Sequence, residues 1–468
     1  MTRRPLDGRV RYGWRPALLL VLSTFSLFHC ARPERIDTVV LIVVDTLRAD
    51  HLGLYGHDRP TTPELDQWAR KGVVFERAFA PSPWTLPSFG SIFTGRLPSE
   101  HRAGSFGRRR GDKTPRRRRF LKLHNTVPTL AEDLAHAGWR TGAFVNNTFL
   151  HSRFGLDRGF QSYDYREANN RKLRRADEVV EDALKWLDKV PEKEQRTFLT
   201  VHLFDPHLNY DPPPPFKGRF GGPPSETGAS DFPDLKALRA RIRDNKEIAW
   251  PELRMLYDEE IAFVDEQIGR LLAGIAERGL WERALVLFTA DHGEEFFDHG
   301  GFEHGHSFYN EVLRVPLVLW GPGIEPGRST RLVSLIDLYP TVLQALRLEA
   351  PDDLTGRSFW PATTDSDVET GEPLLISERN LYGRPQRALI RWPYKLVEHL
   401  RTGRTELYDL GSDPEELSDL SNSRPALTAE LSDLLEQALV TAAELPDDTE
   451  AELDETALEN LRSLGYIE

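Results

Sequence analysis

The sequence of 468 residues predicts an α/β fold in which helices pack on a large, mostly parallel sheet, followed by a small antiparallel sheet. Two observations carry this prediction. Almost wholly apolar runs such as 38–44 (TVVLIVV) are typical of strands buried on both faces, and they alternate with segments of helical periodicity. From about Glu372 onward the runs are short and closely spaced, which indicates hairpins rather than parallel strands linked by helices.

In the first half of the chain, helix-start signals are clear. Thr62 followed by Pro63 is typical of a helix start. A helical segment is also expected after Pro87, which places Thr85 on a turn at or just before a helix N-terminus, where backbone N–H groups favour an oxyanion. The other elements expected here are strands at 38–44, 141–145 and 197–204 and helices at 126–138 and 172–190.

The second half continues the alternation and then changes character. A long amphipathic helix is expected over 252–278, then strands at 284–289 and 315–320 and a helix over 332–346 interrupted at Pro340. Three short strands follow at 388–390, 394–399 and 405–408, and two helices at 426–443 and 452–464. The last helix is expected to dock through Leu461, Leu464 and Ile467.

Composition limits the class of protein. The net charge of -13 makes nucleic acid an unsuitable general partner, because a phosphate backbone would be repelled. The segment 108–119 (RRRGDKTPRRRR) is strongly basic, and is interpreted either as solvated charge or as a clamp for anionic glycans or lipid headgroups. With Cys30 as its one cysteine, the chain forms no intrachain disulfide, so packing must stabilise it.

The first 31 residues are typical of an export signal. Arginines precede the apolar run 17–28, which is too short to span a bilayer. The residues before Cys30 resemble a lipoprotein cleavage box, which would attach the protein to a membrane through Cys30. We therefore expect a periplasmic, cell-envelope or extracellular protein.

Two strand ends carry metal-binding side chains. Asp45 follows the strand at 38–44, and Asp291 and His292 follow the strand at 284–289. Open α/β sheets bind ligands at the carboxyl ends of their strands, so these side chains are expected to meet at one edge. A lone Asp after a strand is more often a helix cap, but two such strand ends predict a divalent-metal site.

Several stretches resemble the sulfatases of the alkaline phosphatase superfamily. They run in family order from Asp37 to the end of the chain, and include VVDTLRADHLGLYG from Val43, FDPHLNYDPP from Phe204, FTADHGEEFFDHG from Phe288 and GHSFYNEVLRVPLVLWGPG from Gly305. The resemblance implies an α/β/α catalytic domain over 36–371 and a small second domain with a helical tail over 372–468.

The resemblance also implies roles for individual residues. Asp45, Asp291 and His292 match metal ligands, and His207 and His306 match positions that contact the bound ester or its leaving group. Calcium is the usual ion of the family, whereas a histidine ligand favours Mn²⁺ or Zn²⁺. One or two ions are expected, with Asp205, His207, His304 and His306 as candidates for a second site.

The nucleophile position departs from the family pattern. Sulfatases place a Cys or Ser, converted to formylglycine, in the motif C/S-x-P-x-R, and here Thr85 stands there with Phe89 in place of the arginine. Formylglycine cannot form from threonine, so none is expected. The lysine and histidine that hold the sulfate in the family align with Asn146 and Thr148, and Thr46 stands where a second Asp often follows the first.

These residues leave three functional hypotheses open. In the first, Thr85 is the nucleophile and a metal ligand in a hydrolase of phosphate or sulfate esters, with phosphate favoured, His306 catalytic, and His207, Asn146 and His304 binding the substrate. In the second, the protein is an inactive relative that binds anionic glycan, and Thr85 is only a helix cap. In the third, a transferase moves a phospho-group from a lipid headgroup to an acceptor.

Overall fold

Strand β1 (Thr38–Val44) lies near the middle of an eight-stranded sheet with the order β12-β2-β11-β8-β1-β7-β5-β6. It pairs in parallel with β8 (Ala284–Ala290) on one side and β7 (Thr197–Leu203) on the other, and every residue of these three strands is buried. The apolar runs in the sequence therefore correspond to strands covered on both faces, as predicted.

The computed structural model describes Met1 and residues 35–106, 119–166, 174–189, 195–221, 250–361, 373–440, 450–463 and 466–467. The predicted export signal with Cys30, and the basic segment up to residue 118, lie outside the described residues. Among the described residues, no helix is long and apolar enough to cross a lipid bilayer.

The remaining strands complete a mixed but mostly parallel sheet. β5 (Arg140–Val145) and β6 (Ser162–Tyr165) extend it beyond β7 in the parallel sense. On the other side, β11 (Arg314–Trp320) runs antiparallel to β8 and to β2 (Val73–Phe79), and β12 (Gly327–Ser334) pairs in parallel with β2. The prediction of a helix over 332–346 is wrong at its start: Leu332 to Ser334 pair with β2, and α9 (Leu338–Ala345) begins only after the turn η7 (Leu335–Asp337).

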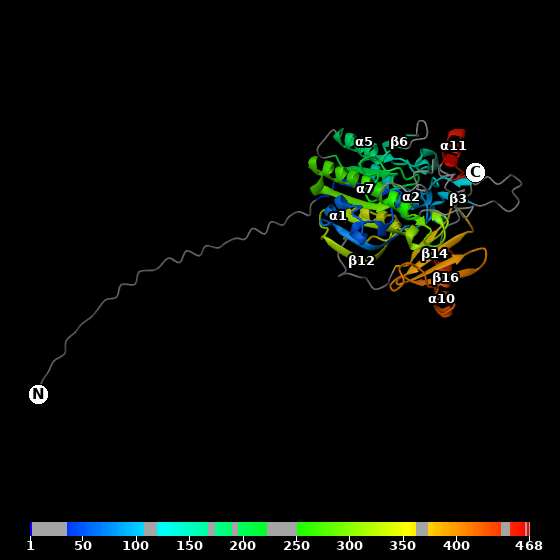
Figure 1. The fold of residues 1–468 in the computed structure, drawn as a ribbon. Helices are drawn as coiled ribbons and strands as arrows, with labels where there is room; N and C mark the ends of the chain where they lie inside the picture. The colour runs from blue at the N-terminus through cyan, green and yellow to red at the C-terminus, as the bar shows by residue number, and fades with distance from the viewer. Residues whose placement is uncertain are drawn as a thin grey trace. The chain divides into compact units, whose positions relative to one another are not determined.

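Two helical layers flank the sheet (Figure 1). In one layer, α1 (Pro63–Ala69) and α5 (Ala176–Asp188) both pack against α7 (Trp250–Glu277). Helix α2 (Thr85–Thr94) contacts α4 (Leu130–His136) and α9 in another. α2 is buried along its whole length, so its first residue, Thr85, is held inside the protein.

The C-terminal part forms a separate four-stranded antiparallel sheet, as predicted. Its strands β13 (Leu375–Glu378), β14 (Gln386–Arg391), β15 (Tyr394–His399) and β16 (Arg404–Asp409) pair in sequence order. Helix α10 (Pro425–Val440) packs on this sheet, and Leu431 and Leu435 share a buried cluster with residues of the strands. Contacts join residues 34–468 into one unit.

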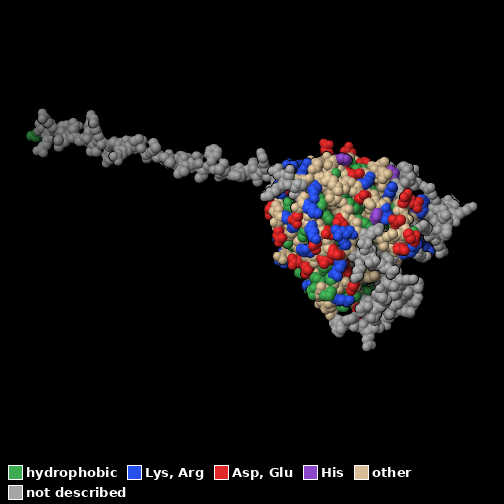
Figure 2. Space-filling model, turned by 90° about the horizontal axis from the view of Figure 1, so that it is seen from above, with side chains coloured by type: hydrophobic (Ala, Val, Ile, Leu, Met, Phe, Trp, Pro, Cys, Tyr) green, Lys and Arg blue, Asp and Glu red, His purple; other side chains and the backbone are tan. Residues whose placement is uncertain are grey.

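Short elements complete the described chain. They are η1 (Ala49–His51), η2 (Gly53–Tyr55), α3 (Pro98–His101), β3 (Gly104–Phe106), β4 (Arg119–Leu121), η3 (Thr148–Leu150), η4 (Ser152–Phe154), η6 (Trp281–Arg283), β9 (Glu295–Phe296), β10 (Phe302–Glu303), α8 (Asn310–Leu313) and α11 (Glu455–Ser463). Helix α11 contacts η3 and lies away from α10 (Figure 1). On the face drawn in Figure 2, acidic and basic side chains are interspersed.

A buried polar link joins the small sheet to the main domain. The Lys395 ammonium lies 2.8 Å from the Glu416 carboxylate, and both side chains are fully buried. Next to it, His299 bonds to the Glu311 carboxylate at 2.7 Å and to the Glu416 carbonyl oxygen at 3.2 Å. Burial opposes the charge on His299, but the hydrogen bond and charge of Glu311 raise its pKa to about 9.

This link predicts a specific pH dependence of stability. Because the folded pKa of His299 exceeds the unfolded value, its contribution is complete below about pH 6.5 and is lost as the pH rises through about 9. We expect the free energy of unfolding to fall by roughly 1–3 kcal/mol over that range, allowing for solvent screening. Urea unfolding of the wild type and of His299→Gln measures it; an equally steep fall in the variant contradicts the assignment.

Candidate active site

Four adjacent parallel strands deliver polar side chains to one edge of the sheet. Asp45 follows β1 and Asp291 follows β8, and in the register of these strands the preceding residues Val44 and Ala290 are partners. His202 lies at the end of β7, and its Nε2 is 3.3 Å from Asp45 Oδ2. Asn147 follows β5, and its amide donates to the same Asp45 oxygen at 2.6 Å. The predicted meeting of strand ends therefore occurs, with His202 and Asn147 added to it.

The carboxylates of Asp45 and Asp291 are incompletely satisfied. Both residues are 0% exposed, yet Asp45 Oδ1 and Asp291 Oδ2 have no hydrogen-bond partner among the described residues. Ligand atoms of Asp45, Asp291 and His292 all lie within 4.8 Å of one another. Buried unpaired carboxylate oxygens are costly unless a cation compensates their charge. The donor set of two carboxylates and one imidazole therefore fits a divalent metal ion.

The pKa shifts of Asp45 and Asp291 also favour a cation beside the two carboxylates. Burial raises the pKa of Asp291, and the neighbouring Asp45 carboxylate raises it further, so that it lies well above its usual range. Burial acts on Asp45 in the same direction, but the hydrogen bond from His202 and the nearby imidazoles lower its pKa below the usual value. Two like charges this close cannot both ionise without compensation.

His292 is oriented by its own backbone neighbourhood. Its Nδ1 lies 2.9 Å from the Gly293 carbonyl oxygen, so Nδ1 carries the hydrogen and donates it. This tautomer leaves the lone pair of Nε2 facing Asp45, at 3.7 Å, and Asp291, at 3.3 Å. Burial lowers the pKa of His292 to about 3, which keeps the ring neutral and able to bind a metal ion.

Thr85 lies directly against this group. It is the first residue of α2, after Trp84 in extended conformation, and is 1% exposed. Its Oγ1 lies 3.3 Å from His292 Nε2 and accepts a hydrogen bond from the Asn147 amide, also at 3.3 Å. A hydroxyl held at a helix N-terminus beside a metal site is suited to nucleophilic attack on an ester.

A second group of side chains borders the cluster. The ring of His304 lies 4.5 Å from that of His292, centroid to centroid, and its Nδ1 is 3.0 Å from the Glu294 carboxylate. His207 donates from Nδ1 to the Leu208 carbonyl oxygen at 2.8 Å, so its Nε2 is the acceptor for the Tyr466 hydroxyl at 2.9 Å. The structure thus brings His207 and His304 together, 5.2 Å apart between ring centroids.

The other residues expected in the site are placed differently. The Asn146 side chain turns to the Arg174 backbone, which it contacts with both its amide nitrogen and its oxygen. His306 Nε2 bonds to Glu295 at 2.8 Å. Asp205 accepts a hydrogen bond at 2.8 Å from the Ala176 N–H at the start of α5. In the described structure these three side chains therefore bond to partners other than the Thr85 hydroxyl.

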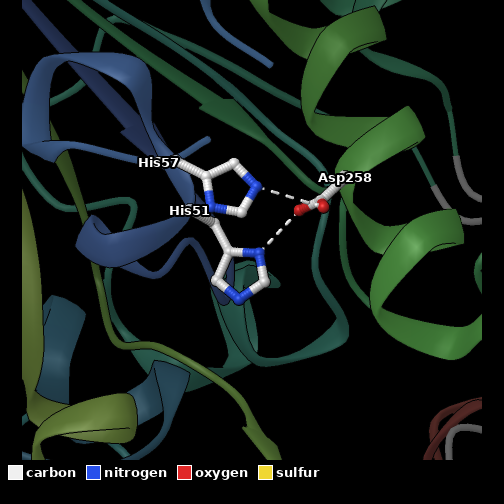
Figure 3. A group of neighbouring side chains, drawn as sticks. All are labelled: His51, His57 and Asp258. Carbon is white, nitrogen blue, oxygen red and sulfur yellow. Dashed lines mark hydrogen bonds and ion pairs between the residues drawn. The ribbon is translucent and has the colours of Figure 1, made fainter. Parts of the chain in front are cut away.

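A further cluster, His51, His57 and Asp258, also has ligand atoms close enough to hold an ion (Figure 3). His51 Nδ1 and His57 Nε2 lie 2.6 and 3.2 Å from the two oxygens of Asp258. The Arg59 guanidinium contacts the same carboxylate at 2.5 Å, so its charge is already compensated by a cationic side chain. We interpret this cluster as a structural link between α7 and the loop after β1.

A cavity of about 700 Å³ lies beside this link and not at the Thr85 cluster. Residues such as Arg48, Arg254 and Glu311 line it, and none of Asp45, Thr85 or Asp291 does. We therefore assign the active site from the chemistry of its side chains rather than from the size of a cavity.

Comparison with known proteins decides the family. The family model described as sulfatase matches residues 37–348, which is most of the chain, and the model "N-sulphoglucosamine sulphohydrolase, C-terminal" matches residues 297–444. The chain belongs to the sulfatase family. Its homologues are ester hydrolases, so this chain is a sulfatase-family hydrolase with an alkaline phosphatase-like fold.

Individual sulfatases and a related hydrolase match along nearly their whole length. An arylsulfatase of Clostridium perfringens is 24% identical over 457 residues, covering 82% of this chain and 90% of the relative. An N-acetylglucosamine-6-O-sulfatase of Bacteroides thetaiotaomicron is 22% identical over 501 residues, covering 86% of each. The phosphonate monoester hydrolase of Agrobacterium radiobacter shares the fold with a TM-score of 0.67 and 19% identity, covering 89% of this chain and 100% of that one.

Sequence reasoning missed four residues of the cluster. The sequence marks His202 only as a polar residue in a strand buried on both faces, and it marks Asn147 only as the neighbour of Asn146. Glu294 lies in the matched stretch after His292 but carried no distinct signal. Tyr466 had none, because nothing local in the sequence indicates that the chain end reaches His207.

The metal assignment predicts a loss of binding in one variant. Asp291→Asn removes a charged ligand, so we expect affinity for Mn²⁺ to fall at least about tenfold, measured by calorimetry and metal analysis. In the wild type, Mn²⁺ raises the melting temperature because the ion binds the folded state; in the variant the rise at the same Mn²⁺ concentration is smaller. His57→Gln is the matched control from the other cluster. If His57→Gln loses the ion and Asp291→Asn keeps it, the assignment is wrong.

Proposed function

We propose that this sulfatase-family protein hydrolyses a phosphorus ester, with Thr85 as the nucleophile. The observation that carries the proposal is the position of the Thr85 hydroxyl. It contacts His292 and Asn147 and lies beside two carboxylates whose unpaired oxygens suit a cation. Asp45, Asp291 and His292 would hold a divalent ion, with Thr85 facing it. Such an ion supplies positive charge that stabilises the transferred group and favours the deprotonated hydroxyl.

Thr85 favours phosphorus over sulfur for a chemical reason. A formylglycine hydrate releases sulfate by collapsing to the aldehyde, so no water needs to attack sulfur. Threonine cannot release the group in this way, so water must attack the phosphorus or sulfur atom of the covalent ester. Attack by water on phosphorus with a positioned electrostatic clamp is common in phosphoryl transfer.

The proposed reaction has two displacements. Thr85 Oγ1 bonds to phosphorus, losing its proton, while the bond to the leaving oxygen breaks and that oxygen takes up one proton. Water then bonds to phosphorus and gives up one proton, the bond to Thr85 Oγ1 breaks, and Thr85 Oγ1 takes up a proton. In both steps Asn147 orients the Thr85 oxygen by its hydrogen bond. We place the leaving group beside His207 and His304, which border the cluster.

The relatives suggest the class of substrate. The structure of BT4656 in complex with its substrate D-glucosamine-2-N,6-O-disulfate matches this chain with a TM-score of 0.70 and 18% identity. The match covers 87% of this chain and 98% of BT4656. The phosphonate monoester hydrolase acts at phosphorus on the same fold. We propose that the substrate is a monoanionic or dianionic ester of a sugar or lipid headgroup. If the N-terminal segment exports the protein and Cys30 anchors it, the enzyme acts on this substrate outside the cytoplasm.

Replacing the nucleophile tests the proposal. We expect Thr85→Ala to lower kcat/KM for an aryl phosphate or phosphonate by at least about a thousandfold, and Thr85→Ser to retain most of the activity. Aryl sulfate should be the poorer substrate. Mass spectrometry after acid quenching should find a phosphoryl group on Thr85.

The matched control is Thr94→Ala, at the other end of the same buried helix, where the hydroxyl donates to the Gly90 carbonyl oxygen. It should leave kcat/KM within about threefold of wild type. Full activity in Thr85→Ala contradicts the proposal. Wild-type protein that turns over no ester but binds sulfated glycan would instead support an inactive relative.

A further inference from the structure

The C-terminal end of the chain reaches the proposed active site. Tyr466, two residues before the last, is 3% exposed, and its hydroxyl donates to His207 Nε2 at 2.9 Å. The same oxygen lies 3.5 Å from His304 Nε2. Its ring packs edge-on against Phe149, with 4.6 Å between centroids, and Phe149 follows Asn147 by two residues.

The segment that carries Tyr466 is anchored at several points. The Ala451 N–H donates to the Phe120 carbonyl oxygen at 2.9 Å, and Arg153 pairs with Asp454 at 3.0 Å. Within α11, Leu461 is fully buried, and the Tyr466 N–H donates to its carbonyl oxygen at 2.8 Å. Tyr466 is therefore placed by hydrogen bonds and packing of the preceding helix, and is not a loosely attached chain end.

The hydrogen-bond directions give Tyr466 a defined task. His207 Nδ1 donates to a backbone carbonyl, so its Nε2 can only accept, and the Tyr466 hydroxyl supplies that hydrogen. His304 Nδ1 faces Glu294, and its Nε2 lies 3.5 Å from the Tyr466 oxygen, whose one hydrogen goes to His207. The Leu208 carbonyl thus sets the tautomer of His207, and the Tyr466 hydroxyl holds its ring angle and borders His304.

We propose that Tyr466 is a positioning residue of the hydrolase, which holds the His207 ring by a hydrogen bond and lies beside His304 at the leaving-group side of the Thr85 cluster. This inference rests on the proposed function. It makes the last residues of the chain part of the active site, although they lie more than a hundred residues after His304 in sequence. A ring held in one orientation gives the leaving group a fixed surface to pack against, whereas a ring that must reorient does not.

Tyr466→Phe is the direct test, because it removes the hydroxyl and keeps the ring. We expect kcat/KM to fall about five- to tenfold for alkyl esters, with most of the loss in kcat. The loss should be smaller for p-nitrophenyl esters, whose leaving group needs little help. Ile467→Ala removes packing from the same segment without touching a hydroxyl, and should leave kcat/KM within about twofold.

A measurement that does not depend on catalysis separates this inference from the proposed function. In protein labelled with ¹⁵N-histidine, the unprotonated nitrogen of His207, assigned with His207→Gln, should shift in Tyr466→Phe but not in Ile467→Ala. Equal losses for both kinds of ester, or an unmoved His207 resonance, would show that Tyr466 only fills space. If Thr85→Ala stays active, the proposed function fails while the ¹⁵N result still decides the hydrogen bond.

Discussion

Two carboxylates buried at the ends of neighbouring strands are the constraint around which this site is arranged. Parallel pairing of β1 with β8 brings Asp45 and Asp291 together, because Val44 and Ala290 are partners in the register. Burial makes their mutual repulsion severe. The surrounding groups, among them the Asn147 amide and the Thr46 N–H, point donors at these oxygens, yet one oxygen of each remains unpaired. A cation is the simplest way to complete that balance.

The same constraint explains the loop after β1. Thr46 has a φ of 54°, a left-handed conformation that β-branched residues rarely adopt. Its carbonyl accepts a hydrogen bond from Tyr257 at 2.7 Å, and the next turn is tied to α7 through the His51–Asp258 pair. Strain at this point is compensated by fixed partners on α7. The His51–Asp258 pair, drawn in Figure 3, therefore ties the loop that follows Asp45 to α7.

Sequence reasoning predicted the features that depend on local pattern. The apolar runs located β1, β7 and β8, and their ends located Asp45 and Asp291, because parallel strands must share an edge. Sequence reasoning failed where packing between residues far apart in the sequence determines the structure. β2 was not expected, since Glu76 and Arg77 interrupt its apolar pattern and are accommodated by partial exposure between β11 and β12. The choice between Asn146 and Asn147 depends on backbone direction past the end of β5, and Tyr466 depends on how the chain end returns.

The most direct measurement is the anomalous diffraction of crystals grown with Mn²⁺. We expect one strong peak between the carboxylates of Asp45 and Asp291, within bonding distance of both and adjacent to Thr85 Oγ1. A peak at the His51–Asp258 pair, or fully ordered Asp45 and Asp291 with no density between them at saturating Mn²⁺, would contradict the central claim that a cation joins these strand ends to the nucleophile.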